Sequence, residues 1–109
     1  IRAVLDHAAM AASSTPPLAT IVTGSSRGIG LAIAEALAAP GRRLVLTARD
    51  AAALTAAADR VRARGAEVLT VAADLRDEQA PGQIVAAAEQ RFGGVDAVVS
   101  NAGTAPADK

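Results

Sequence analysis

Apolar and polar residues follow one another along the chain in blocks of two different periods. Short, nearly continuous apolar runs rich in β-branched residues cover residues 18–23, 44–48, 68–73 and 95–100. Such runs are typical of strands that are buried on both faces. Between them, apolar residues recur at intervals of three and four, the period of an amphipathic helix. The pattern therefore predicts four strands that alternate with three helices.

Each predicted helix has an apolar stripe that would face the strands. The stripes are formed by Ile29, Ile33 and Leu37 in the first helix, by Leu54, Ala58 and Val61 in the second, and by Ile84, Ala88 and Phe92 in the third. We expect Arg60, Arg62 and Arg64 to form the solvated side of the second helix.

Residues with capping or breaking properties bound the first two helices. The first covers about residues 28–39 and ends before Pro40 and Gly41. Asp50 is expected to cap the second helix with its side chain, and Gly65 ends it.

The start of the third helix has two interpretations. Asp77 is a suitable N-cap for a helix that runs to about Phe92. Pro81 is tolerated only in a first turn, which favours a later start near Gln79 or Ala80.

Strands that alternate with helices indicate a parallel sheet covered by helices on both faces. Right-handed crossovers then give a doubly wound sheet with the strand order 3-2-1-4. The chain has 109 residues, which is enough for one domain. The sequence therefore predicts an α/β fold built on one doubly wound parallel sheet.

Composition restricts the function further. Eleven basic and eleven acidic side chains cancel, so no overall field favours nucleic acid, and no apolar run reaches the roughly 20 residues that span a membrane. The chain has no Cys, and we predict no metal site and a cytoplasmic location. Residues 1–17, with Met10 as a candidate natural start, are interpreted as a disordered lead-in to the domain at 18–109.

The turn after the first predicted strand, residues 23–30, reads TGSSRGIG and is typical of a loop that binds a pyrophosphate. Gly24 lets the chain turn, Gly28 leaves room for the phosphates, and Gly30 permits close packing of helix on strand. Amides at the helix start and nearby hydroxyls can donate to phosphate oxygens. The predicted binding residues of this loop are Gly24, Ser25, Ser26, Arg27, Gly28, Ile29 and Gly30.

With this motif the chain resembles the short-chain dehydrogenase/reductase family over about residues 18–103. Two further family motifs follow in order, Asp74-Leu75 after the third strand and Asn101-Ala102-Gly103 after the fourth, where Ser100 replaces the usual Asn. The resemblance implies a Rossmann-type fold, cut off after its fourth strand, in which Asp74 contacts adenine. It also implies a homo-oligomeric parent that transfers a hydride between a dinucleotide and a small carbonyl or alcohol, with 3-oxoacyl thioester reduction as one outcome.

The end of the second predicted strand bears on cofactor choice. Enzymes that select NAD(H) place a carboxylate there for the ribose hydroxyls. This chain has Ala48 at that position, followed by Arg49, and Arg27 in the glycine loop can approach the same ribose. Two guanidinium groups around a 2′-phosphate favour NADP(H) over NAD(H), and Asp50 is better placed as a helix cap.

The residues that carry the family's chemistry are missing from this sequence. The resemblance implies that catalysis uses a Ser and a Tyr-x-x-x-Lys pair. This chain has no Tyr, and its single Lys is Lys109. No catalytic residue is therefore assigned, and we interpret the chain as the NADP(H)-binding portion of a longer enzyme. The alternative is a complete, non-catalytic nucleotide-binding or interaction module, whose fourth strand would be an uncovered sheet edge.

We expect the 109-residue chain by itself to show no dehydrogenase turnover, because it lacks the proton donor. The measurement is NADPH absorbance with carbonyl substrates and pure protein. A robust cofactor-dependent rate would show that the catalytic assignment is wrong.

Overall fold

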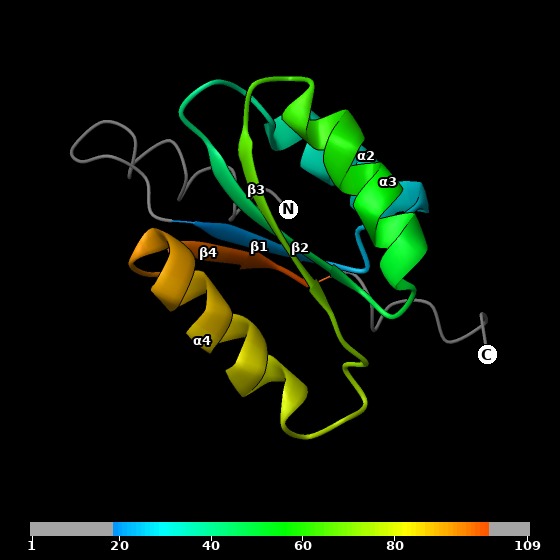
Figure 1. Cartoon of the computed structure of the whole chain (residues 1–109), viewed down its shortest axis with the longest axis vertical. Helices are drawn as coiled ribbons and strands as arrows, with labels where there is room; N and C mark the ends of the chain where they lie inside the picture. The colour runs from blue at the N-terminus through cyan, green and yellow to red at the C-terminus, as the bar shows by residue number, and fades with distance from the viewer. Residues whose placement is uncertain (1–18, 101–109) are drawn as a thin grey trace.

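The computed structural model describes residues 19–100 and contains one parallel sheet of four strands in the order β3-β2-β1-β4 (Figure 1). This is the predicted doubly wound order. The elements are β1 (Thr20–Thr23), α2 (Gly28–Leu37), β2 (Arg43–Ala48), α3 (Ala51–Arg62), β3 (Glu67–Ala72), α4 (Ala80–Phe92) and β4 (Ala97–Val99). The predicted lead-in and Met10 lie outside the described residues.

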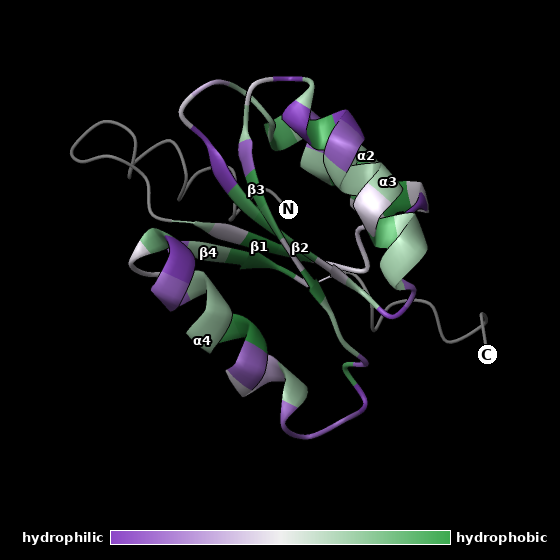
Figure 2. Ribbon diagram, in the orientation of Figure 1, coloured by the Kyte–Doolittle hydropathy of each residue, from purple (hydrophilic) through white to green (hydrophobic). Residues whose placement is uncertain are grey.

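Helices cover both faces of the sheet, with α2 and α3 on one side and α4 on the other (Figure 1). Successive side chains of a strand point to opposite faces, so each strand contributes to two cores. In β1, Val22 belongs to the cluster under α2 and α3, and Ile21 to the cluster under α4. Figure 2 shows the apolar strands between helices whose outer faces are more polar.

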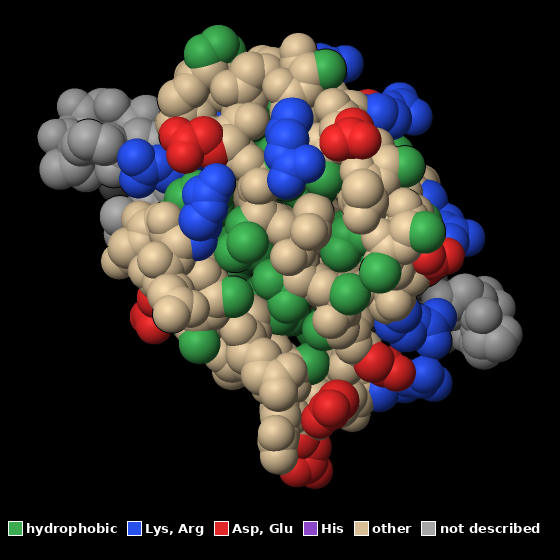
Figure 3. Space-filling view, in the orientation of Figure 1, with side chains coloured by type: hydrophobic (Ala, Val, Ile, Leu, Met, Phe, Trp, Pro, Cys, Tyr) green, Lys and Arg blue, Asp and Glu red, His purple; other side chains and the backbone are tan. Residues whose placement is uncertain are grey.

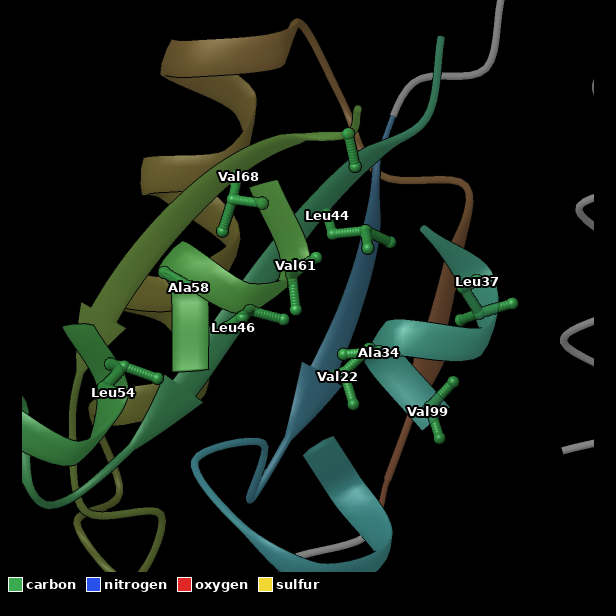
Figure 4. Close-up of a cluster of buried hydrophobic side chains, with 11 residues drawn as sticks. Val22, Ala34, Leu37, Leu44, Leu46, Leu54, Ala58, Val61, Val68 and Val99 are labelled. Atoms are coloured by element: carbon green, nitrogen blue, oxygen red, sulfur yellow. The ribbon is translucent and has the colours of Figure 1, made fainter. Parts of the chain in front are cut away.

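The larger cluster joins the sheet to α2 and α3 (Figure 4). Leu44 and Leu46 of β2 are at most 1% exposed and lie beneath the predicted stripe of α3. That stripe, Leu54, Ala58 and Val61, is buried as predicted, and so is the stripe of α4, Ile84, Ala88 and Phe92.

The predicted inner face of α2 is wrong at one position. Ile29 is 68% exposed, whereas the buried residues of this helix are Gly30, Ala34 and Leu37. These residues are spaced i, i+4 and i+7, the spacing of one helix face. Ile29 is only the second residue of the helix, where the chain has just left the sheet edge, so its side chain points away from the strands.

The later start predicted for α4 is confirmed. Gln79 is the N-cap, and Asp77 instead accepts a hydrogen bond from the Gln79 amide at 2.9 Å. Pro81 lies in the first turn, where its missing N–H costs no helical hydrogen bond. Asp77 therefore shapes the turn before the helix.

Two arginines of α3 do more than form a solvated side. The Arg60 Nε lies 2.8 Å from Glu35 Oε2 and links α3 to α2. The Arg62 guanidinium donates to the carbonyl of Val68 at 3.1 Å. Val68 lies on β3, the edge strand at the opposite end of the sheet from β4. Figure 3 shows the molecule from the β3 side, with apolar side chains between the flanking helices. Arg62 thus satisfies a carbonyl on a strand with one neighbour.

Asp50 caps α3 as predicted, because its Oδ1 accepts from the amides of Ala52 and Ala53 at 3.0 and 3.1 Å. Asp50→Ala removes both bonds and should lower the free energy of unfolding by about 1 kcal/mol. Urea unfolding followed by circular dichroism measures the loss. Asp50→Asn, which keeps a capping oxygen, is the control and should lose much less; equal losses for the two variants would contradict the capping role.

Candidate functional site

The carboxyl ends of parallel strands meet at one edge of the sheet, and most predicted site residues follow them there. The glycine loop follows β1, Arg49 follows β2, and Asp74 follows β3. The structure thus brings together segments that are far apart in the sequence. Asn101, Ala102 and Gly103, predicted to follow β4, lie outside the described residues.

Two glycines bend the chain between β1 and α2. Gly24 has a φ of 63° and Gly28 a φ of 60°, values that side chains with a Cβ rarely adopt. A Cβ placed on Gly28 would meet no atom of residues 19–100 within 4 Å, apart from its chain neighbours and its own helix backbone. The space beside Gly28 is therefore open, and a ligand can approach the main chain there.

The amino end of α2 faces this open space without a cap of its own. Arg27 is the N-cap residue, with extended backbone and no side-chain capping bond. The first helical hydrogen bond runs from the Leu31 amide to the Arg27 carbonyl at 3.3 Å. The amides of Gly28, Ile29 and Gly30 precede it and have no acceptor within the helix. Together with the helix dipole they form a site suited to an anion.

Ser25 connects this turn to β2 by hydrogen bonds. Its side chain is fully buried, and its Oγ accepts from the Thr47 amide at 3.0 Å and donates to the Thr47 carbonyl at 3.4 Å. The Ser25 amide donates to the same carbonyl at 3.1 Å. The hydroxyl that the sequence offered to a phosphate is thus engaged within the fold. Ser26 is half-buried, and Arg27 is exposed.

A second hydroxyl ties the end of β1 to β4. Thr23 Oγ1 donates to the Val99 carbonyl at 3.3 Å. These hydrogen-bonding roles of Thr23 and Ser25 were not predicted from the sequence. The signal available in the sequence was a hydroxyl residue at or just after the end of an apolar strand, where main-chain groups need partners.

Asp74, after β3, is held by Arg76. The Arg76 Nη2 lies 2.9 Å from Asp74 Oδ2, its Nε lies 3.1 Å from Oδ1, and its backbone amide donates to Oδ1 at 2.9 Å. These hydrogen bonds, with smaller contributions from the charges of Arg76 and Arg49, lower the pKa of Asp74 to about 2. Asp74 therefore stays a carboxylate to a lower pH than an ordinary Asp does. Leu75 is half-buried against the cluster under α4.

The charges at this edge are mainly positive around the end of β2. Arg49 is exposed, and Ala48 at the strand end has no charge. Asp50 next to them is directed to the amides of α3. Among the described residues, no cluster of His, Cys, Asp or Glu could hold a metal ion. None of the described helices combines the length and apolar character needed to cross a membrane.

The fold and this edge define a doubly wound α/β protein with an open glycine turn and an uncapped helix end after its first strand. The family model for short chain dehydrogenases matches residues 19–109, and the chain belongs to that family. The family resemblance and the Rossmann-type fold predicted from the sequence are confirmed.

Relatives of known structure or name agree with this assignment. A protein named as a ketoacyl reductase of the granaticin polyketide synthase of Streptomyces violaceoruber is 43% identical over 84% of this chain and 35% of its own length. The L-sorbose reductase of Gluconobacter frateurii, solved with NADPH and L-sorbose, is 42% identical, with a TM-score of 0.75 over 81% of this chain and 34% of that one. A variant actinorhodin polyketide ketoreductase with NADPH is 34% identical, with a TM-score of 0.73 over 78% and 33%. The chain thus spans about a third of their length.

Ser25→Ala leaves the buried Thr47 amide without its acceptor and should lower the free energy of unfolding by about 1–3 kcal/mol. Urea unfolding measures the difference. Ser26→Ala, one residue away and half-buried, is the matched control and should change stability by no more than about 0.5 kcal/mol. Equal stabilities of the two variants would contradict the tying role of Ser25.

Proposed function

We propose that the chain is the NADP(H)-binding portion of a short-chain dehydrogenase/reductase that reduces a carbonyl compound or oxidises an alcohol. The observation that carries the proposal is the uncapped amino end of α2 beside the open turn at Gly28. Membership of the family gives this anion site its proposed ligand, the pyrophosphate of a nicotinamide dinucleotide.

The residues present fit such a cofactor. The amides of Gly28 and Ile29 would donate to the pyrophosphate, and the Ser26 hydroxyl would add a donor. Ser25 would act through the shape of the loop, since its hydroxyl is bound to Thr47. When bound, the nicotinamide supplies or accepts the hydride.

The adenine end of the cofactor would lie toward β3. Asp74, a carboxylate at neutral pH, would accept a hydrogen bond from the base, and the chain at Leu75 would border the ring. Asn101, Ala102 and Gly103 would extend the site after β4, as the family resemblance implies. No catalytic residue is proposed within this chain.

A preference for NADP(H) over NAD(H) follows from the end of β2. Arg49 and Arg27 are exposed cations at the same sheet edge, and Ala48 leaves no carboxylate to repel a 2′-phosphate. The nearest acid in sequence, Asp50, is held by the amides of α3. Two relatives of solved structure, the L-sorbose reductase and the actinorhodin polyketide ketoreductase, contain NADPH, which supports this preference.

For the parent enzyme we propose a 3-oxoacyl thioester as the first substrate to test. The support is the names of relatives, including a 3-oxoacyl-[acyl-carrier protein] reductase from Brucella melitensis that is 38% identical over 82% of this chain. The L-sorbose reductase makes a sugar ketone the second candidate. A cytoplasmic homo-oligomer is proposed as the assembly.

Arg49→Ala should weaken NADPH binding by about 1–3 kcal/mol and leave NADH binding nearly unchanged, because only NADPH carries the 2′-phosphate. Titration calorimetry with both cofactors measures the two affinities. Arg64→Ala, which removes an exposed guanidinium just beyond α3, is the control for loss of charge. Equal titration curves of the unsubstituted chain with NADPH and NADH would contradict the proposed preference, and no binding of either would contradict the function.

A further inference from the structure

The pair of Asp74 and Arg76 has a geometry more specific than an ordinary surface ion pair. The guanidinium meets the carboxylate with two nitrogens, Nε on Oδ1 at 3.1 Å and Nη2 on Oδ2 at 2.9 Å. The Arg76 backbone amide adds a bond to Oδ1 at 2.9 Å. A two-point contact between planar groups fixes the rotation of the carboxylate, which a single-point contact does not.

The hydrogen bonds also determine which acceptor positions of Asp74 are left. A carboxylate has about four lone-pair sites, two on each oxygen. Oδ1 accepts from both the Arg76 amide and Nε, so its two sites are taken. Oδ2 accepts from Nη2 at 2.9 Å and shares the Nε hydrogen at the longer distance of 3.3 Å, so it is the oxygen with more acceptor capacity left for a further donor. The Asp74 side chain is 40% exposed, so a ligand can reach that oxygen.

We propose that Arg76 is a positioning residue that holds Asp74 with Oδ2 open for the 6-amino group of adenine. The proposal rests on the function proposed above, in which the adenine lies beside Asp74. It adds a basis for base specificity: an oriented carboxylate accepts from a 6-amino purine, and it repels the carbonyl of a 6-oxo purine.

A structural role in stability does not explain this geometry. The Arg76 side chain is 78% exposed, and an exposed ion pair contributes little to folding. The partners are two residues apart in one turn, so the pair joins no separate elements. What the pair does control is the direction and charge of one carboxylate at the edge where the site residues meet.

The test compares two cofactors that differ only at the base. NADPH has a 6-amino purine, and nicotinamide hypoxanthine dinucleotide phosphate in its reduced form has a 6-oxo purine. The fluorescence anisotropy of the reduced nicotinamide gives both dissociation constants, without Trp or Tyr fluorescence from the chain. Because both cofactors carry the same phosphates, the ratio of the two constants removes long-range effects of charge.

We expect the unsubstituted chain to bind NADPH roughly tenfold more tightly than the hypoxanthine analogue, the scale of one hydrogen bond to a charged group. Arg76→Ala should bring this ratio close to one, and Arg76→Lys, which keeps the charge without the two-point contact, should restore only part of it. Arg64→Ala is the control and should keep the full ratio. An unchanged ratio in Arg76→Ala, or a full ratio in Arg76→Lys, would overturn the positioning role while leaving the proposed function intact.

A measurement without cofactor tests the pair itself. Carbon-13 NMR of the Asp74 carboxyl should show little titration between about pH 6 and about pH 3, because Arg76 holds its pKa at about 2. In Arg76→Ala the pKa should return toward the ordinary value of 3.8, and the signal should move within this range. An unsubstituted chain whose Asp74 titrates near 3.8 would overturn the inference. Failure of that chain to bind NADPH, with this titration as expected, would overturn the proposed function and with it the role assigned to the adenine.

Discussion

The joining of the glycine turn to the end of β2 is the interaction on which the site depends. The Ser25 amide and hydroxyl both bond to Thr47, which continues the pairing of β1 and β2 beyond the last residue of β1. This fixes where the chain leaves the sheet. The positive φ of Gly28 then turns it into α2, so the amino end of that helix lies at the carboxyl edge of the strands.

The parallel sheet decides which charges share this edge. Because β2 lies between β1 and β3, the residues that follow it stand between the glycine turn and Asp74. The Arg49 charge reaches Asp74 and helps to lower its pKa. Asp50, one residue further, is removed from the edge by its bonds to the amides of α3. The same local capping that starts α3 therefore leaves the end of β2 positive.

Close packing of α2 on the sheet depends on small residues. Gly30 and Ala34 are buried on its inner face, and Leu37 completes that face at the far end. Ile29, in the first turn, is left 68% exposed beside the amides at the amino end of α2.

Much of this arrangement could be predicted from local patterns. The strand order, the stripes of α3 and α4, the cap at Asp50 and the glycine turn all follow from hydrophobic period, turn chemistry and the handedness of crossovers. The inner face of α2 was predicted correctly at Ile33 and Leu37 but not at Ile29, because the spacing of these three residues fits a helix face as well as that of Gly30, Ala34 and Leu37 does. The turn between β1 and α2, with the positive φ of Gly24 and Gly28, orients the helix and so decides which of the two possible faces meets the sheet.

The sequence by itself determined the fold class and the family, and it supplied the residues of the proposed cofactor edge, because each is encoded in short motifs and periods. Only the tertiary structure decided how those residues are used. The hydroxyls of Ser25 and Thr23 form hydrogen bonds with the main chains of β2 and β4, and Arg76 holds Asp74. These roles depend on distances between segments and on side-chain rotations, which residue spacing along a chain does not specify.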